Sequence, residues 1–116
     1  MMRTLEVKGE EIVARQTTWI WPQVLPKGSI FIWDGDPGQG KSLITLEIAA
    51  KISRGAAMPL CEESTRTPPR KVLFLTAEDS LEETVTPRLL AAGADMTNIR
   101  FFQGWVDDRT SDYTPP

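Results

Sequence analysis

The sequence predicts an α/β fold in which helices flank a parallel sheet. Nearly continuous apolar runs, rich in β-branched and aromatic residues, occur at residues 29–34, 71–76 and 98–103. Such runs suit strands that are buried on both faces of a parallel sheet. Segments with helical patterning separate them, at 41–54 and from residue 80 onward. This alternation along 116 residues fits a single α/β domain.

Composition narrows the class of protein. Charged residues make up 25% of the chain, and 13 Lys and Arg against 16 Asp and Glu give a net charge of −3. Neither value indicates wholesale disorder or a bulk electrostatic attraction to nucleic acid. A single cysteine, Cys61, and the lack of His exclude an intramolecular disulfide, Cys/His zinc fingers and His-based triads. With no signal peptide and no apolar run near the roughly 18 residues of a membrane span, a cytoplasmic location away from membranes is expected.

The chain divides into three parts. Residues 1–18 are polar and of mixed charge, and we expect a weakly structured lead-in there. Residues 19–104 hold the expected domain, which starts with an aromatic segment and a turn at 26–28 before the strand at 29–34. Residues 105–116 are polar and end in proline, so we expect a disordered tail.

The segment 41–54 gives the strongest helical pattern. Its apolar residues cover most of the helix circumference, while Glu47, Lys51 and Arg54 form one stripe expected to face solvent. Gly55 then stands at the position where a left-handed residue ends a helix.

The second half of the domain repeats the strand-to-helix order. A loop rich in proline and acidic residues leads to the strand at 71–76. Ser80 and Glu83 have the spacing of a capping box, which predicts a helix start. Pro87 predicts either a kink or a restart of the helix with Thr86 as its cap.

The segment 35–42 carries the strongest functional signal. It matches G-x-x-x-x-G-K-[ST] at every fixed position, between an apolar run and a helical segment. Its glycines let backbone N–H groups turn toward a phosphate at the helix N-terminus, Lys41 can reach the β- and γ-phosphates, and the Ser42 hydroxyl can bind Mg²⁺. The alternative is a glycine-rich turn that fits by chance. The expected nucleotide contacts are Gly35, Asp36, Pro37, Gly38, Gln39, Gly40, Lys41, Ser42 and Leu43.

Two carboxylates follow the strand at 71–76. Ligands gather at the carboxyl ends of the strands in an open α/β sheet, so Glu78 is expected at the same edge as the phosphate loop. There it could orient or deprotonate the water that attacks the γ-phosphate, and Asp79 is a candidate partner for a Mg²⁺-bound water. Alternatively, both are acids at a helix N-terminus, favoured by the helix dipole.

Four segments in order resemble a known family. They are Trp-Pro-x-x-x-Pro-x-Gly at 21–28, the loop at 35–42, the strand and acids at 72–80, and Pro-Arg-Leu leading to Ala-Gly-Ala-Asp at 87–95. Across residues 21–102 the chain resembles the RecA-like P-loop ATPases. Within them it is most similar to the ATPases of RepA-type replicative helicases, often called the AAA_25 family.

This resemblance implies a homo-hexameric ATPase that uses ATP and Mg²⁺ and acts on single-stranded DNA. Lys41 and Glu78 match the catalytic positions of the family. A RecA-like core extends well beyond this length and supplies its Walker B aspartate, DNA-binding loops and arginine finger after the third strand. The segment after residue 102 is too short for a Walker B strand, so we expect the chain to hold the N-terminal half of such a core, truncated before that strand.

Other functions and binding residues stay open. Similar phosphate loops occur in nucleotide kinases, and a module that binds nucleotide without hydrolysing it is a third alternative. Trp19, Trp21 and Trp33 could stack on a base, although aromatic side chains more commonly pack in a core. Arg88 could lie at a subunit interface or in a surface salt bridge.

Overall fold

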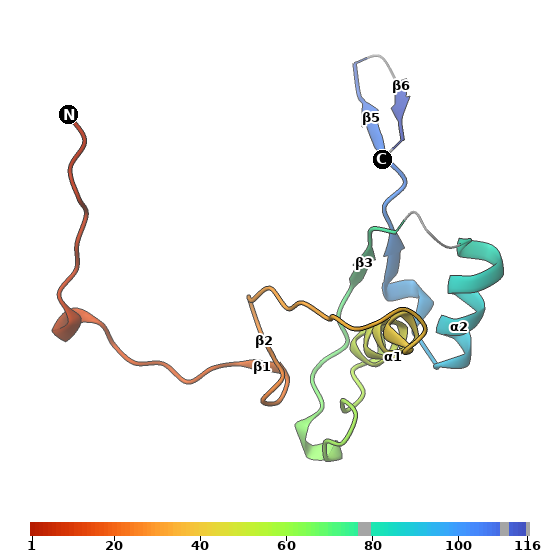
Figure 1. Ribbon diagram of the computed structural model, residues 1–116, viewed down its shortest axis with the longest axis horizontal. Helices are drawn as coiled ribbons and strands as arrows, with labels where there is room; N and C mark the ends of the chain where they lie inside the picture. Colours follow the sequence, from red (N-terminus) through yellow and green to blue (C-terminus); the bar gives the residue numbers. More distant parts are fainter. Residues whose placement is uncertain (77–79, 110–111, 116) are drawn as a thin grey trace.

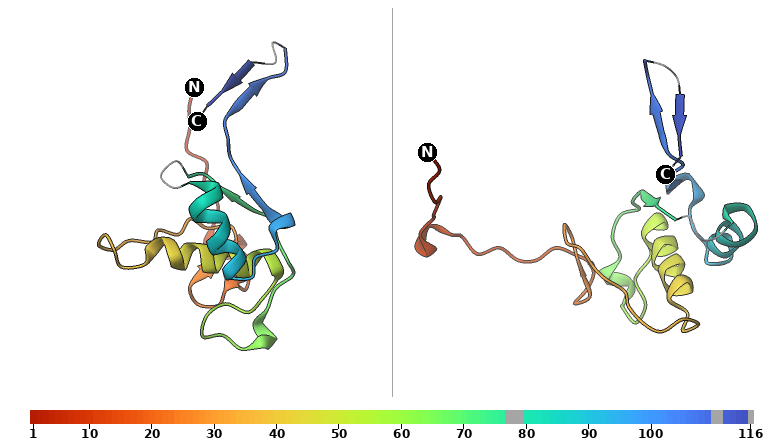
Figure 2. Two further views of the ribbon diagram at one scale, coloured as in Figure 1. Left: turned by 90° about the vertical axis from the view of Figure 1, so that its right-hand side faces the viewer. Right: turned by 45° about the horizontal axis from the view of Figure 1, so that its top comes forward.

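The computed structural model describes residues 1–76, 80–109 and 112–115. Two helices and short strands form a central body, from which an N-terminal arm and a hairpin extend in different directions (Figure 1, Figure 2). The radius of gyration is 18.9 Å, against about 13 Å for a compact domain of 100 residues. The arm contains one short helical turn, η1 (Gly9–Glu11), and is exposed along residues 1–18.

Helix α1 (Lys41–Arg54) has the predicted bounds. It ends at Gly55, whose φ of 68° is left-handed and whose N–H donates to the Ile52 carbonyl oxygen. The predicted pair of Glu47 and Lys51 is present, with a separation of 3.4 Å between carboxylate and ammonium. The prediction that Arg54 faces solvent is wrong, because its guanidinium donates to the carbonyl oxygen of Ala92 at 2.5 Å.

Strands β3 (Val72–Phe74) and β4 (Ile99–Phe101) pair in parallel, as the alternation of elements predicts. Phe74 and Phe101 lie opposite each other, and their rings stack with centroids 5.6 Å apart. This small sheet is not buried on both faces, because Leu73 is 58% exposed. Burial on both faces is therefore a wrong prediction for β3, whose outer side has no described layer to cover it.

The prediction of a strand at 29–34 is wrong. The segment has no regular secondary structure, and its Ile30 is 95% exposed. Just before it, β1 (Trp19–Trp21) and β2 (Leu25–Pro26) pair with each other in an antiparallel hairpin. A strand needs backbone partners as well as apolar side chains. Among the described strands, β1 pairs with β2 and β3 with β4, and none pairs with 29–34.

The second helical region begins as the capping box predicts. The Glu83 N–H donates to the Ser80 hydroxyl oxygen at 3.2 Å, and a π-helical turn, η3 (Leu81–Val85), follows. Helix α2 (Thr86–Ala91) continues from it, with Pro87 in its first turn. The helix therefore restarts next to the proline, although Val85, and not Thr86, stands at the cap position.

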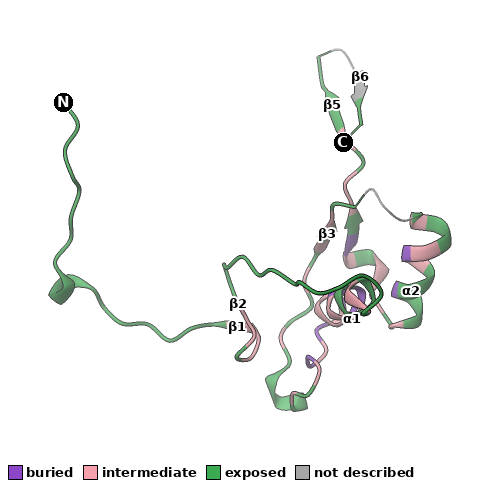
Figure 3. Cartoon of the chain, in the orientation of Figure 1, coloured by how far each residue is buried: buried purple, intermediate pink, exposed green. Residues whose placement is uncertain are grey.

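The core lies where α1, α2 and β4 meet (Figure 3). Its buried apolar residues are Leu46 and Ala49 of α1, Val85 and Leu89 of the second helical region, and Ile99 of β4. Burial of such side chains contributes roughly 1.5–3 kcal/mol for each large one. This packing fixes α1 against the sheet and so places the N-terminus of α1 beside the end of β3.

The remaining elements are short. Strands β5 (Trp105–Asp107) and β6 (Asp112–Thr114) form an antiparallel hairpin that projects from the body (Figure 1). Turns η2 (Glu63–Thr65) and η4 (Met96–Asn98) lie in the connections. Within the described residues, none of the helices has the length and apolar character that crossing a membrane requires.

Candidate functional site

The loop at 35–42 is exposed along most of its length and runs directly into α1. Gly38 and Gly40 have φ angles of 80° and 82°, a left-handed conformation that side chains with a Cβ rarely adopt. A Cβ added at either position would meet nothing within 4 Å. The backbone conformation of the loop, and not crowding around it, therefore requires these two glycines.

The N-terminus of α1 is electrostatically open to an anion. No side chain caps it, and its first turn contains no acidic residue. The first intrahelical bond runs from the Ile44 N–H to the Gly40 carbonyl oxygen at 3.0 Å. The N–H groups of residues 41–43 precede that bond, so they lack an intrahelical acceptor and carry the positive end of the helix dipole.

Two side chains organise the loop. The Asp34 carboxylate accepts a hydrogen bond from the Gly35 N–H at 2.8 Å, at the point where the loop begins. The ammonium group of Lys41 donates to the carbonyl oxygen of Gly35, so this side chain folds back across the loop. Lys41 thus lies over the same backbone that would surround a phosphate, while Ser42 is exposed.

A cavity of about 310 Å³ joins the start of α1 to the carboxyl end of β3. Its polar lining includes Lys41, Ser42 and Thr45 from α1 and Thr76 from the residues after β3. The start of α1 and the residues after β3 therefore line one cavity, although residues 29–34, directly before the phosphate loop, form no strand. Glu78 and Asp79 lie outside those residues, and their roles stay predictions.

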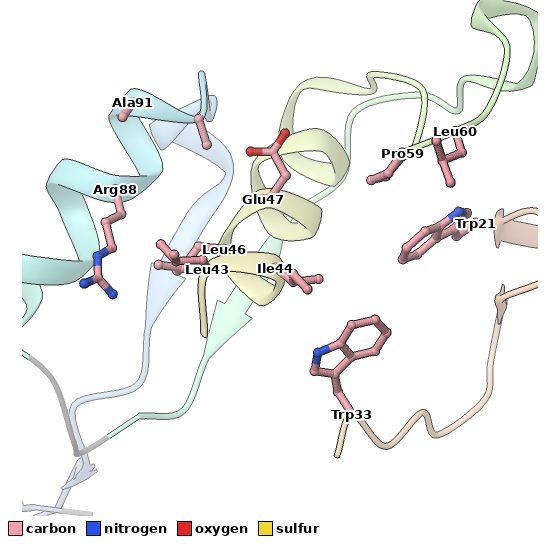
Figure 4. Close-up of a pocket in the computed structure, with 11 residues that line it drawn as sticks. Trp21, Trp33, Leu43, Ile44, Leu46, Glu47, Pro59, Leu60, Arg88 and Ala91 are labelled. Carbon is pink, nitrogen blue, oxygen red and sulfur yellow. The ribbon is translucent and has the colours of Figure 1, made fainter. Parts of the chain in front are cut away.

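A second cavity, of about 620 Å³, lies on the neighbouring side of α1 (Figure 4). The rings of Trp21 and Trp33 face α1 across it, and Ile44 points from the helix toward them. The prediction that Trp33 lies in a buried strand missed its position on this cavity, whereas the alternative that it could stack on a base requires such an accessible position. A further sequence signal is that this aromatic residue stands two positions before the phosphate loop.

The described residues contain no group of three or more Cys, Asp or Glu side chains that could hold a metal ion. A Mg²⁺ ion bound with a nucleotide commonly has few protein ligands and keeps waters and phosphate oxygens as the others. The exposed hydroxyl of Ser42 at the start of α1 fits such a site.

Comparison with known protein families identifies the family of this chain. The model of a family described as "AAA domain", AAA_25, matches residues 2–114, which is nearly the whole chain. No curated protein and no solved structure matches the chain significantly. The matched span includes the loop at 35–42, helix α1, the parallel pair of strands and the acids after β3.

Proposed function

Because the chain belongs to the AAA_25 family of AAA domains, which are P-loop ATPase-type modules, we propose that it binds ATP with Mg²⁺ in the loop at 35–42 and hydrolyses it. ATP and Mg²⁺ use is general in AAA domains. The observation that carries the proposal is the uncapped, acid-free N-terminus of α1 behind a loop with two left-handed glycines.

The phosphate loop supplies the binding groups. N–H groups of the loop and of the first turn of α1 hold the β- and γ-phosphates, where the helix dipole favours negative charge. Lys41 exchanges the Gly35 carbonyl oxygen for a phosphate oxygen, and a phosphate is the stronger partner because it is charged. Ser42 is the protein ligand proposed for Mg²⁺, which when bound neutralises charge that develops on the phosphates.

Hydrolysis requires a group that activates water. We assign this role to Glu78, which accepts a proton from the attacking water. The water oxygen forms a bond to the γ-phosphorus while the bond between that phosphorus and the leaving ADP oxygen breaks. Asp79 is proposed to assist through a Mg²⁺-bound water. Support comes from Thr76, which stands two positions before Glu78 and lines the same cavity as Lys41 and Ser42.

The resemblance to RepA-type helicases supports a more specific proposal. Copies of the chain assemble into a homo-hexamer in the cytoplasm and couple ATP hydrolysis to movement along single-stranded DNA. Oligomerisation is common among AAA domains. DNA-stimulated turnover by the assembled protein is the measurement that separates this helicase proposal from a simple ATPase.

The test is Mg²⁺-dependent ATP turnover, with ATP binding followed in the same samples. We expect Lys41→Ala to abolish both. Glu78→Gln should retain binding but lose turnover by about 100-fold or more, because a positioned general base contributes that much. Lys27→Ala is the matched control, since it removes an exposed lysine outside the loop.

Other results would refute the proposal or identify a different function. Unchanged ATP binding in Lys41→Ala would refute the proposal. Binding without turnover in the wild-type chain would identify a nucleotide-binding module that does not hydrolyse ATP. Transfer of the γ-phosphate to an acceptor other than water would identify a kinase.

A further inference from the structure

Trp33 lines three cavities. It lines the 310 Å³ cavity that contains Lys41 and Ser42, the 620 Å³ cavity on the neighbouring side of α1, and a third of about 280 Å³. Its side chain is 40% exposed, and its ring packs against Phe31 with centroids 5.7 Å apart. A large part of its aromatic surface is therefore available for a ligand.

The 620 Å³ cavity has the size and lining of a small-molecule site. Its walls are mostly apolar and include Trp21, Trp33, Leu43 and Ile44. Trp33 and Leu46 line both this cavity and the one at the phosphate loop, so the two are neighbours. A molecule anchored by its phosphates at the start of α1 could extend past Trp33 into the apolar cavity.

We propose that Trp33 stacks on the base of the nucleotide whose phosphates the loop at 35–42 holds, and that the 620 Å³ cavity receives this base. The inference rests on the proposed function. A base is planar and apolar on both faces, and proteins that bind single-stranded nucleic acids stack such bases on aromatic side chains. Trp33 is joined to the loop by a single residue, Asp34, so the stacking surface and the phosphate site are adjacent in the chain.

The side of the cavity opposite the tryptophans has a cationic side chain. Arg88 of α2 lines the cavity across from Trp21 and Trp33, as Figure 4 shows, and a guanidinium has only hydrogen-bond donors. Glu47 also lines the cavity, but Lys51 neutralises it at 3.4 Å. The polar part of the lining is therefore one guanidinium and one ion-paired carboxylate, beside an apolar surface.

The test compares two ligands, Mg²⁺·ATP and Mg²⁺·tripolyphosphate, because the second has the phosphates but no base. We expect Trp33→Ala to weaken ATP binding about tenfold or more, the size expected for one stacked base. Tripolyphosphate binding should stay unchanged. Trp33→Phe should retain most of the ATP affinity. Trp105→Ala is the matched control, since Trp105 is exposed on β5 and lines none of the three cavities.

A second measurement, of tryptophan emission, uses the wild-type chain and only the conservative variant Trp33→Phe. In the wild-type chain ATP should change the tryptophan emission while tripolyphosphate leaves it unaltered, and Trp33→Phe should remove most of that change. Equal weakening of both ligands in Trp33→Ala, or no weakening of either, would overturn the stacking proposal while leaving the phosphate site intact. If neither ligand binds the wild-type chain, both this inference and the proposed function fail.

Discussion

Gly55 determines how α1 ends and how closely the following loop can approach the helix. It ends α1 with a left-handed φ of 68°, and a Cβ placed on it would lie 2.5 Å from the Thr67 carbonyl oxygen and 2.8 Å from the Pro69 nitrogen. Both atoms belong to the backbone, which cannot rotate away as a side chain can. The close approach holds the 55–70 loop against the end of α1, and the Arg66 guanidinium strengthens it by donating to the Gly55 carbonyl oxygen at 3.0 Å.

We therefore expect Gly55→Ala to destabilise the fold by about 1–2 kcal/mol or more. The left-handed conformation alone accounts for about that amount in a residue with a Cβ, and the contact with Thr67 adds to it. Urea denaturation followed by circular dichroism gives the free energy of unfolding. Gly9→Ala serves as the control, because a Cβ there meets nothing within 4 Å; an equal effect of both substitutions would contradict this reasoning.

At the scale of elements, a cluster of hydrogen bonds joins the end of α1 to the turn before β4. The hydroxyl of Ser53, which is fully buried, accepts from the Asp95 N–H at 2.9 Å. The Asn98 side-chain amide donates to the Ser53 carbonyl oxygen at 2.8 Å, and Arg54 reaches Ala92 at 2.5 Å. These bonds span more than 35 residues of sequence and keep α1, α2 and β4 in one arrangement.

Removal of the Ser53 hydroxyl should loosen this junction. Ser53→Ala leaves the Asp95 N–H without its acceptor in a half-buried position, which costs about 1–3 kcal/mol. Ser64→Ala is the matched control, because Ser64 is exposed and its hydroxyl bonds only a neighbouring carboxylate. The same denaturation experiment should show a lower midpoint for Ser53→Ala alone, and identical midpoints for the two variants would argue against the junction.

The elements also show what the sequence can predict. Helix α1 has its predicted bounds because its signals are local: a phosphate loop before it, apolar periodicity within it and Gly55 after it. The parallel pairing of β3 with β4 follows from the order of elements. The strand expected at 29–34 fails because strand formation depends on a partner far away in sequence, and composition does not encode which partner is available.

The candidate site also has parts that the sequence predicts and parts that it does not. The loop at 35–42 and its place before α1 are readable from spacing alone, since glycines and the helix start are local features. Thr76 and Lys41 line one cavity although residues 29–34, directly before the phosphate loop, form no strand, so the general rule for strand ends does not by itself explain their placement. The cavity beside Trp33 is not readable from sequence, because residues from β1, α1, α2 and the 55–70 loop build it only after folding. For Glu78 the catalytic role stays a prediction.

At the scale of the whole molecule, apolar side chains are unusually exposed. Ile30 and Ile32 are 95% and 82% exposed, and within the described strands the outer edge of β3 has no partner. Exposed segments of high β-propensity and unpaired strand edges promote association between chains. The extended N-terminal arm adds further apolar surface, including Leu5.

The purified chain should therefore self-associate as its concentration rises, and the double substitution Ile30→Lys with Ile32→Lys should reduce this. Light scattering across a concentration series measures the effect. The pair Gln16→Lys with Thr17→Lys adds the same two charges at exposed polar positions and should leave association nearly unchanged. A monodisperse monomer in the wild-type chain would rule the expectation out.

Helix α1 connects two distant parts of the molecule. It holds the proposed phosphate site at one end and, through Ser53 and Arg54, the turn before β4 at the other. Its 14 residues span about 21 Å. A short helix packed along one side against Leu89 and Ile99 moves as a rigid body. If a ligand tilts or shifts the Lys41 end of α1, the end bonded to the turn before β4 therefore moves with it. Through α1, a ligand at the phosphate loop is coupled mechanically to the opposite side of the molecule.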